Sequence, residues 1–222
     1  MRALALMLVA VTACAKASAE QLADDDTGRA RYEMRQHLDD LRTIEQMTLA
    51  GKLEPAKTLA FFLAQQADIF RDHAEGRDIA FAASTLMNVT TQDEALDAEL
   101  RVAQACAHCH QRLGASLKFP GPFDAPPDRL DVDSQMKRHQ WAVDRMFNGL
   151  IGPDDEQWRA GVYVFATSPL QRLDVPDPDA AKQLQMRARK ALDARGRLTI
   201  EQRAGVYREL LAECVGCHAA RT

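Results

Sequence analysis

The chain has 222 residues, of which 46% are hydrophobic, 27% charged and 6% aromatic. This length and composition exclude a disordered chain and a fibrous repeat, and the formal net charge of −4 provides no basic surface for nucleic acid. Because aromatic residues are few and Ala, Leu, Gln, Arg and Glu are good helix formers, the composition predicts an all-α protein.

The first 19 residues have the pattern of an export signal. Arg2 precedes an apolar run over residues 3–13, which is too short to cross a bilayer but suits the core of a signal peptide. Small residues at 17 and 19 indicate cleavage after Ala19, whereas Val-Thr-Ala-Cys over residues 11–14 resembles a lipoprotein box, whose cysteine is lipidated after cleavage. Both interpretations predict an exported, periplasmic protein, and the second adds membrane attachment through Cys14.

Helical periodicity predicts two similar halves with four helices each. The predicted helices span about 25–50, 54–74, 78–89 and 92–113, and then 131–151, 153–167, 178–194 and 200–220. Residues 114–130 hold four prolines and no sustained period, which predicts a linker. Since short connections make consecutive helices antiparallel, we expect two tandem up-down-up-down four-helix bundles, over residues 20–113 and 131–222.

Helix ends and core positions support this division. Capping boxes are predicted from Thr91 to Glu94 and from Thr199 to Gln202, before the last helix of each half. Gly51 and Gly152 are predicted to end the first helices, and Pro55, Pro153 and Pro178 suit first turns. The aromatic residues expected to line the cores are Phe61, Phe62, Trp141, Phe147, Trp158 and Phe165.

Each half ends with a C-x-x-C-H motif, the spacing of covalent c-type haem attachment. The motif residues are Cys106, Cys109 and His110 in the first half and Cys214, Cys217 and His218 in the second. On a helix, residues i, i+3 and i+4 share a face, so two thiols can join the haem vinyl groups while the adjacent imidazole binds the iron. We therefore expect two haem c groups, with His110 and His218 as iron ligands.

Other uses of paired cysteines fit less well. The first cysteines of the two pairs are 108 residues apart, from Cys106 to Cys214, whereas zinc ribbons separate their C-x-x-C pairs by about 15–20 residues. Thioredoxin-like chemistry needs a βαβ context, which the sequence does not predict. A disulfide within one helical turn closes almost no loop and leaves the following histidines unexplained.

With this terminal motif on its last helix, each half resembles a cytochrome c′-type four-helix bundle. The resemblance covers nearly the whole mature chain, although two haems in tandem depart from the usual single one. It implies a periplasmic electron carrier or, as in five-coordinate members of the family, a binder of small gases. Relatives of that family can also use a methionine of the first helix as the distal iron ligand.

The sixth ligand of each iron is sought among duplicated residues on the first helices. His37 and His139 lie at matching places, 69 and 75 residues before Cys106 and Cys214, and are our candidates for bis-histidine iron. Met34 and Met136, three residues earlier, are also duplicated and are the alternative ligands.

These observations predict a dihaem c-type cytochrome that carries single electrons and transforms no substrate. Its acidic excess favours transient redox partners with a basic docking patch. The alternatives are a five-coordinate haem that senses or scavenges NO or CO, and a dihaem peroxidase with one open haem. No paired catalytic carboxylates or nucleophile motif predict another enzyme.

Overall fold

The structure is a computed structural model that describes residues 28, 32–67, 74–115, 117, 119, 123–170, 173, 175–194 and 197–219. Apart from a short 3₁₀ assignment at Leu170, the regular structure in these ranges is α-helical and no strand occurs among them, which confirms an all-α protein. The chain divides into two compact units, residues 1–40 and 41–222. The expected signal peptide and Cys14 lie outside the described residues.

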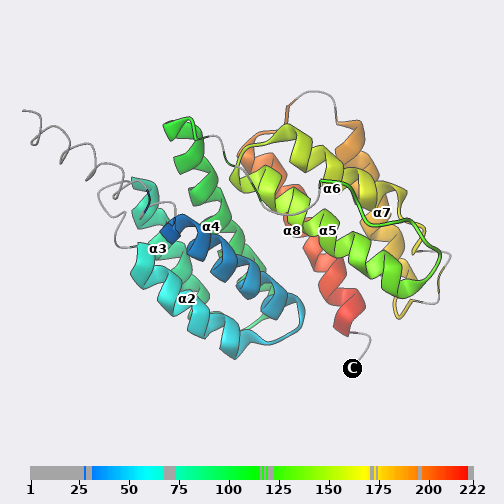
Figure 1. The fold of residues 1–222 in the computed structure, drawn as a ribbon. Helices are drawn as coiled ribbons and strands as arrows, with labels where there is room; N and C mark the ends of the chain where they lie inside the picture. The colour runs from blue at the N-terminus through cyan, green and yellow to red at the C-terminus, as the bar shows by residue number, and fades with distance from the viewer. Residues whose placement is uncertain are drawn as a thin grey trace, which may run out of the picture. The chain divides into compact units, whose positions relative to one another are not determined.

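From residue 92 onward the helices follow the predicted boundaries closely (Figure 1). The predicted boundary between the second and third helices, over 54–74 and 78–89, was wrong, since the third helix runs from Ala74 to Leu86. Residues 32–40 of the first unit and residues 41–49 of the second are helical. The second unit continues with α2 (Leu53–Ala67), α3 (Ala74–Leu86), α4 (Gln92–Leu113), α5 (Val132–Ile151), α6 (Asp155–Thr167), α7 (Pro178–Asp193) and α8 (Ile200–Ala219). The described residues between α4 and α5 form no helix, as expected for a linker.

Local capping explains where the two motif helices begin. The Thr91 side chain accepts from the Glu94 backbone N–H at 3.2 Å, and the Glu94 carboxylate accepts from the Thr91 N–H at 3.1 Å. Thr199 and Gln202 make the same reciprocal pair, at 3.2 and 2.9 Å. Both predicted capping boxes are therefore confirmed.

Two helix ends test the predicted role of the prolines. Pro178 occupies the first turn of α7, behind an Asp177 cap, as predicted. Pro153 precedes α6 instead of entering it, because the Asp154 side chain accepts from the N–H groups of Glu156 and Gln157 and thus caps a helix that begins at Asp155, two residues later than predicted.

In residues 41–222, helices that are consecutive in sequence pack together, and α8 also packs against α4 and α5. The pair α5 and α6 approaches very closely at two glycines. A Cβ at Gly149 would lie 2.4 Å from the Trp158 backbone nitrogen, and one at Gly161 would lie 2.5 Å from the Ala142 carbonyl oxygen. The missing side chains therefore permit this helix contact.

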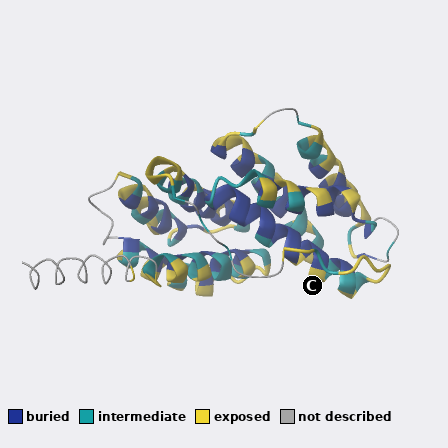
Figure 2. Cartoon of the chain, turned by 45° about the horizontal axis from the view of Figure 1, so that its top comes forward, coloured by how far each residue is buried: buried dark blue, intermediate teal, exposed yellow. Residues whose placement is uncertain are grey.

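Figure 2 shows that buried and exposed residues alternate around the helices. Most of the predicted aromatic core is buried, with two exceptions. The four aromatic side chains of the second half are buried, namely Trp141, Phe147, Trp158 and Phe165. Phe61 and Phe62 were expected in the core but are 43% and 48% exposed. The buried face of α2 runs through Ala56, Ala60, Leu63 and Ala67, so the two phenylalanines fall on its other faces.

Among the described residues, no helix combines the length and the apolar character that crossing a membrane requires.

Candidate functional site

The first C-x-x-C-H motif lies on the last two turns of α4. The helix ends at Gly114, whose φ of 61° is left-handed, and its backbone N–H donates to the Gln111 carbonyl at 3.2 Å. Cys106, Cys109 and His110 therefore stay in helical register to the end. Their spacing places the two sulfur atoms and the imidazole on adjoining positions of one face, as the sequence predicts.

The His110 ring is held by a backbone group from the other half of the chain. Its Nδ1 lies 3.0 Å from the carbonyl oxygen of Ile151, the last residue of α5. A carbonyl oxygen only accepts, so this bond places the ring proton on Nδ1 and leaves the lone pair on Nε2. Metal-bound histidines characteristically donate their other ring N–H in this way.

Burial also keeps this imidazole neutral. The pKa of His110 is lowered by burial, with an opposing rise from its bond to Ile151. The linker contributes to this region, because a Cβ at Gly152 would lie 2.8 Å from the Phe119 ring. The carbonyl at the end of α5 thus supports the imidazole in its metal-binding protonation state, while Phe119 of the linker packs beside the next residue, Gly152.

All four motif cysteines are free thiols. Burial, followed by the effect of Cys109, raises the pKa of Cys106 to about 12, and burial likewise raises the pKa of Cys109. For Cys214, burial is again the first cause and the Glu45 charge the second, and the pKa rises to about 12. Protonated, half-buried thiols of this kind are unsuited to disulfide exchange, which needs the thiolate.

The second motif is less enclosed than the first. Cys214 and Cys217 lie on the last turns of α8, and His218 is exposed one residue before the end of that helix. The structure thus places each motif on the C-terminal turns of its own helix, but surrounds His110 with more protein than His218.

The two motif helices pack in opposite directions. Arg208 of α8 pairs with Asp97 of α4 at 3.0 Å, while His108 near the end of α4 lies 3.1 Å from Glu201 near the start of α8. From the Arg208–Asp97 pair, Cys106 lies nine residues toward one end of the contact and Cys214 six residues toward the other. Fifteen residues at 1.5 Å each separate Cys106 and Cys214 by about 20 Å along the contact.

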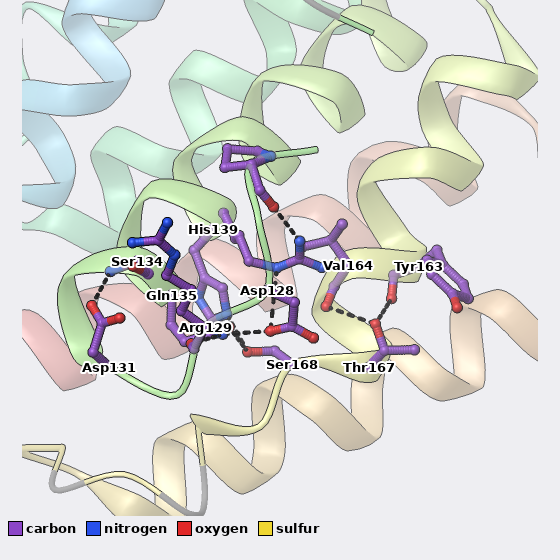
Figure 3. Close-up of polar contacts among 12 residues, drawn as sticks. Asp128, Arg129, Asp131, Ser134, Gln135, His139, Tyr163, Val164, Thr167 and Ser168 are labelled. Atoms are coloured by element: carbon purple, nitrogen blue, oxygen red, sulfur yellow. Dashed lines mark hydrogen bonds and ion pairs between the residues drawn. The ribbon is translucent and has the colours of Figure 1, made fainter. Parts of the chain in front are cut away.

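The distal candidate His139 takes part in a buried polar network (Figure 3). Its Nε2 lies 2.8 Å from the Ser168 hydroxyl, which also contacts the Gln135 side-chain oxygen at 3.3 Å. The His139 ring packs edge-on against Phe165, with ring centres 4.8 Å apart. Coordination of iron through Nε2 would require the Ser168 contact to break.

Burial controls the charge of His139 too. Burial, followed by the Arg138 charge, lowers the pKa of His139 to about 4. The imidazole is therefore neutral at physiological pH, the state in which histidine binds metals. Met136, one turn earlier on α5, is partly buried.

His37 and Met34 lie in the first unit, on helical residues 32–40. Burial lowers the pKa of His37, against an opposing effect of Glu33. Met34 is partly buried. The first motif lies in the other unit, so the prediction that His37 or Met34 reaches the first iron stays a prediction.

Sequence reasoning missed one buried polar cluster in the second unit. Glu45, Glu99 and Tyr207 come from three different helical segments and are at most 2% exposed. A signal was present at Glu99, because Leu96 and Ala103 flank it at i−3 and i+4 on the inward face of α4. In the described ranges, no three His, Cys, Asp or Glu side chains gather in a group that could hold a metal ion.

Comparisons of the chain with protein-family models, with curated proteins and with solved structures give no match.

Proposed function

We propose that this chain is an exported, periplasmic dihaem c-type cytochrome that carries single electrons between redox partner proteins. One haem would be attached at Cys106 and Cys109, the other at Cys214 and Cys217. In this proposal each half is a cytochrome c′-type four-helix bundle, and residues 114–130 link the two. The bound haem supplies the redox chemistry, as its iron alternates between the ferric and ferrous states.

The observation that carries the proposal is the contact between His110 and Ile151. Nδ1 of the imidazole is 3.0 Å from the backbone carbonyl, so Nε2 is left to bind iron. This arrangement occurs next to two free, protonated thiols at the required spacing. The residues of the first motif thus fit a covalently bound haem with an imidazole ligand.

The second motif fits the same group through its donor set. Cys214 and Cys217 are free, and His218 follows them on the last turn of α8. A haem at this place would cover surface beside the exposed imidazole and complete the packing at this end of the helix. Burial of both porphyrins would limit rearrangement as charge comes and goes.

For the sixth ligands we propose His37 in the first half and His139 in the second, with Met34 and Met136 as the alternatives. His139 is already neutral and buried. A rotation that breaks its 2.8 Å contact with Ser168 would free Nε2 for the iron. An imidazole or a thioether ligand would each complete the six-coordination of the iron, but a thioether should give the haem the higher reduction potential.

One observation favours a second function for the second haem. If the bond between His139 and Ser168 persists in the haem-loaded protein, the iron beside His218 keeps an open position. An open position would allow NO or CO to bind, and one closed haem beside one open haem is also the arrangement that a dihaem peroxidase needs.

The test is spectroscopy and mass measurement on the purified mature protein. We expect two covalent haems per chain, seen as an added mass and a pyridine haemochrome count of two. Six-coordinate iron should give low-spin spectra and no rapid CO binding after reduction, whereas CO binding at one haem would support the second function. A colourless protein with the mass of bare polypeptide would overturn both.

Matched variants assign the two haems. Cys106→Ala with Cys109→Ala should leave one haem per chain, and so should Cys214→Ala with Cys217→Ala. His108→Ala is the control, since this motif position is exposed and has no proposed role in haem binding. Retention of two covalent haems in either double variant would contradict the assigned attachment sites.

A further inference from the structure

A buried carboxyl pair lies beside the contact between the two motif helices. Glu45 comes from helical residues 41–49 and is 2% exposed, and Glu99 comes from α4 and is 1% exposed. Tyr207 of α8 is fully buried and donates a 2.6 Å hydrogen bond to the Glu45 carboxylate. The proposed haem function does not use these groups.

The two carboxyl groups have unequal surroundings. Glu45 accepts the hydrogen bond from Tyr207, which stabilises its charged form. Glu99 shares a hydrogen bond with Glu45, which raises the pKa of Glu99 and lowers that of Glu45. With its proton, Glu99 donates that bond, whereas an ionised Glu99 would be buried with no donor for its two oxygens, so Glu99 is the member that keeps its proton.

The charges around the pair are mostly of the same sign. Arg42 is the cation that acts on Glu45, from the same helical segment, and its guanidinium donates to Asn148 at 2.5 Å. Asp144 of α5 adds a negative charge, and Tyr207 and the Cys214 thiol face Glu45 from α8. Two cations, Arg42 and the Arg145 that acts on Asp144, therefore face three carboxyl groups in a poorly solvated region, which favours retention of protons there.

The pKa shifts agree with this geometry. Burial is the first cause that raises the pKa of Glu45, to about 7, although Tyr207 and Arg42 oppose the rise. Burial and the neighbouring Glu45 charge raise the pKa of Glu99 well above its ordinary value. Glu99 is thus a neutral acid at pH 7, while Glu45 is close to half-protonated.

Glu45 is also electrostatically coupled to the second attachment site. Of the charges that act on the Cys214 thiol, that of Glu45 has the largest effect. We propose that Glu45 binds one proton when the haem attached at Cys214 is reduced and releases it when that haem is oxidised. This inference rests on the proposed function, because it needs a haem at Cys214.

The step balances in charge and atoms. One electron from a donor protein converts ferric to ferrous iron, and the negative charge thus added near Glu45 makes its carboxylate a stronger base. One proton from water then binds a Glu45 carboxylate oxygen, while Glu99 stays protonated throughout. Transfer of the electron to an acceptor protein reverses the change, and Glu45 returns the proton to water.

The test is the midpoint potential of each haem as a function of pH, measured on the haem-loaded chain. A proton coupled fully to one electron changes the redox equilibrium tenfold per pH unit, equivalent to about 59 mV. We expect the midpoint potential of the haem at Cys214 to fall as the pH rises through 7, with a slope smaller than this full one-proton value. Glu45→Gln should abolish that slope.

Two further variants control the interpretation. Glu213→Gln removes a charge beside the same cysteine but leaves Glu45 and Glu99 intact. It should therefore shift the midpoint potential by the same amount at every pH and keep the slope. Glu99→Gln keeps a neutral side chain that can still donate a hydrogen bond to Glu45, so it should preserve both the slope and the pH at which the slope is centred. These variants separate proton binding at Glu45 from a general effect of charge.

Infrared difference spectra of reduced minus oxidised protein provide a second readout. A protonated-carboxyl band should appear on reduction and be absent from Glu45→Gln. Two bound haems with potentials that do not depend on pH would overturn this inference and leave the proposed function standing, as would a slope that survives in Glu45→Gln. A chain without haem would overturn both the proposed function and this inference.

Discussion

Replacing Glu45 by Gln should make the stability of the protein less dependent on pH. Burial raises the pKa of Glu45 from its ordinary value of 4.5 to about 7, so the folded state binds this proton more tightly than the unfolded chain does. The stability due to this proton is fully present below pH 4.5 and is lost as the pH rises through 7. At about 1.4 kcal/mol per pKa unit, the Glu45 proton alone accounts for a loss of about 3 kcal/mol of unfolding free energy over that range.

Urea unfolding from pH 5 to pH 8.5 measures this effect as a difference between variant and wild-type. As the pH rises, the unfolding free energy of Glu45→Gln should increase relative to that of the wild-type, by most of the expected value of about 3 kcal/mol. His139 acts with the opposite sign, because its lowered pKa makes stability fall as the pH drops toward 4, but it is common to both proteins. Glu54→Gln, at an exposed position of α2, is the control. A difference between Glu45→Gln and wild-type that stays constant with pH would refute the assignment of a raised pKa to Glu45.

Three other variants test separate parts of the structure. Ser168→Ala removes the partner of His139 and should increase the low-spin fraction of the haem-loaded protein, measured by visible absorption; an unchanged fraction would count against His139 as a ligand. Gly161→Ala places a methyl group 2.5 Å from the Ala142 carbonyl oxygen and should destabilise the protein by about 1–3 kcal/mol in thermal unfolding, whereas an unchanged midpoint would show that α5 and α6 can separate freely. Thr91→Ala removes the cap of α4 and should cost about 1 kcal/mol in urea unfolding, with Thr91→Ser as the conservative control.

Local chemistry made the helices predictable from sequence. The starts of α4 and α8 follow from the Thr91 and Thr199 capping boxes, in which a side chain and a backbone group only three residues apart satisfy each other. The end of α4 follows from Gly114, which adopts the left-handed conformation that terminates a helix. Such interactions need no knowledge of the rest of the fold.

Hydrophobic periodicity could not predict the contacts between residues that are far apart in sequence. The bond between His110 and Ile151 joins a side chain to a carbonyl 41 positions away, and any residue type at 151 would supply that carbonyl. Glu45 and Tyr207 are separated by 162 positions, and nothing in their local sequences pairs them. The exposure of Phe61 has the same origin, since the packing partners of α2 decide which of its faces is covered.

The surface pairing of Arg208 has a consequence for the distance over which electrons would travel. Its guanidinium lies 3.0 Å from Asp97 and 3.4 Å from Asp93, two carboxylates one helical turn apart. A slide of α8 along α4 by a full turn, about 5.4 Å, would exchange this bridge for a single contact at its edge. The bridge therefore favours the helix register that sets the spacing of the two cysteine pairs. Because its groups are exposed to solvent, concentrated salt should screen this ion pair and weaken its hold on the register.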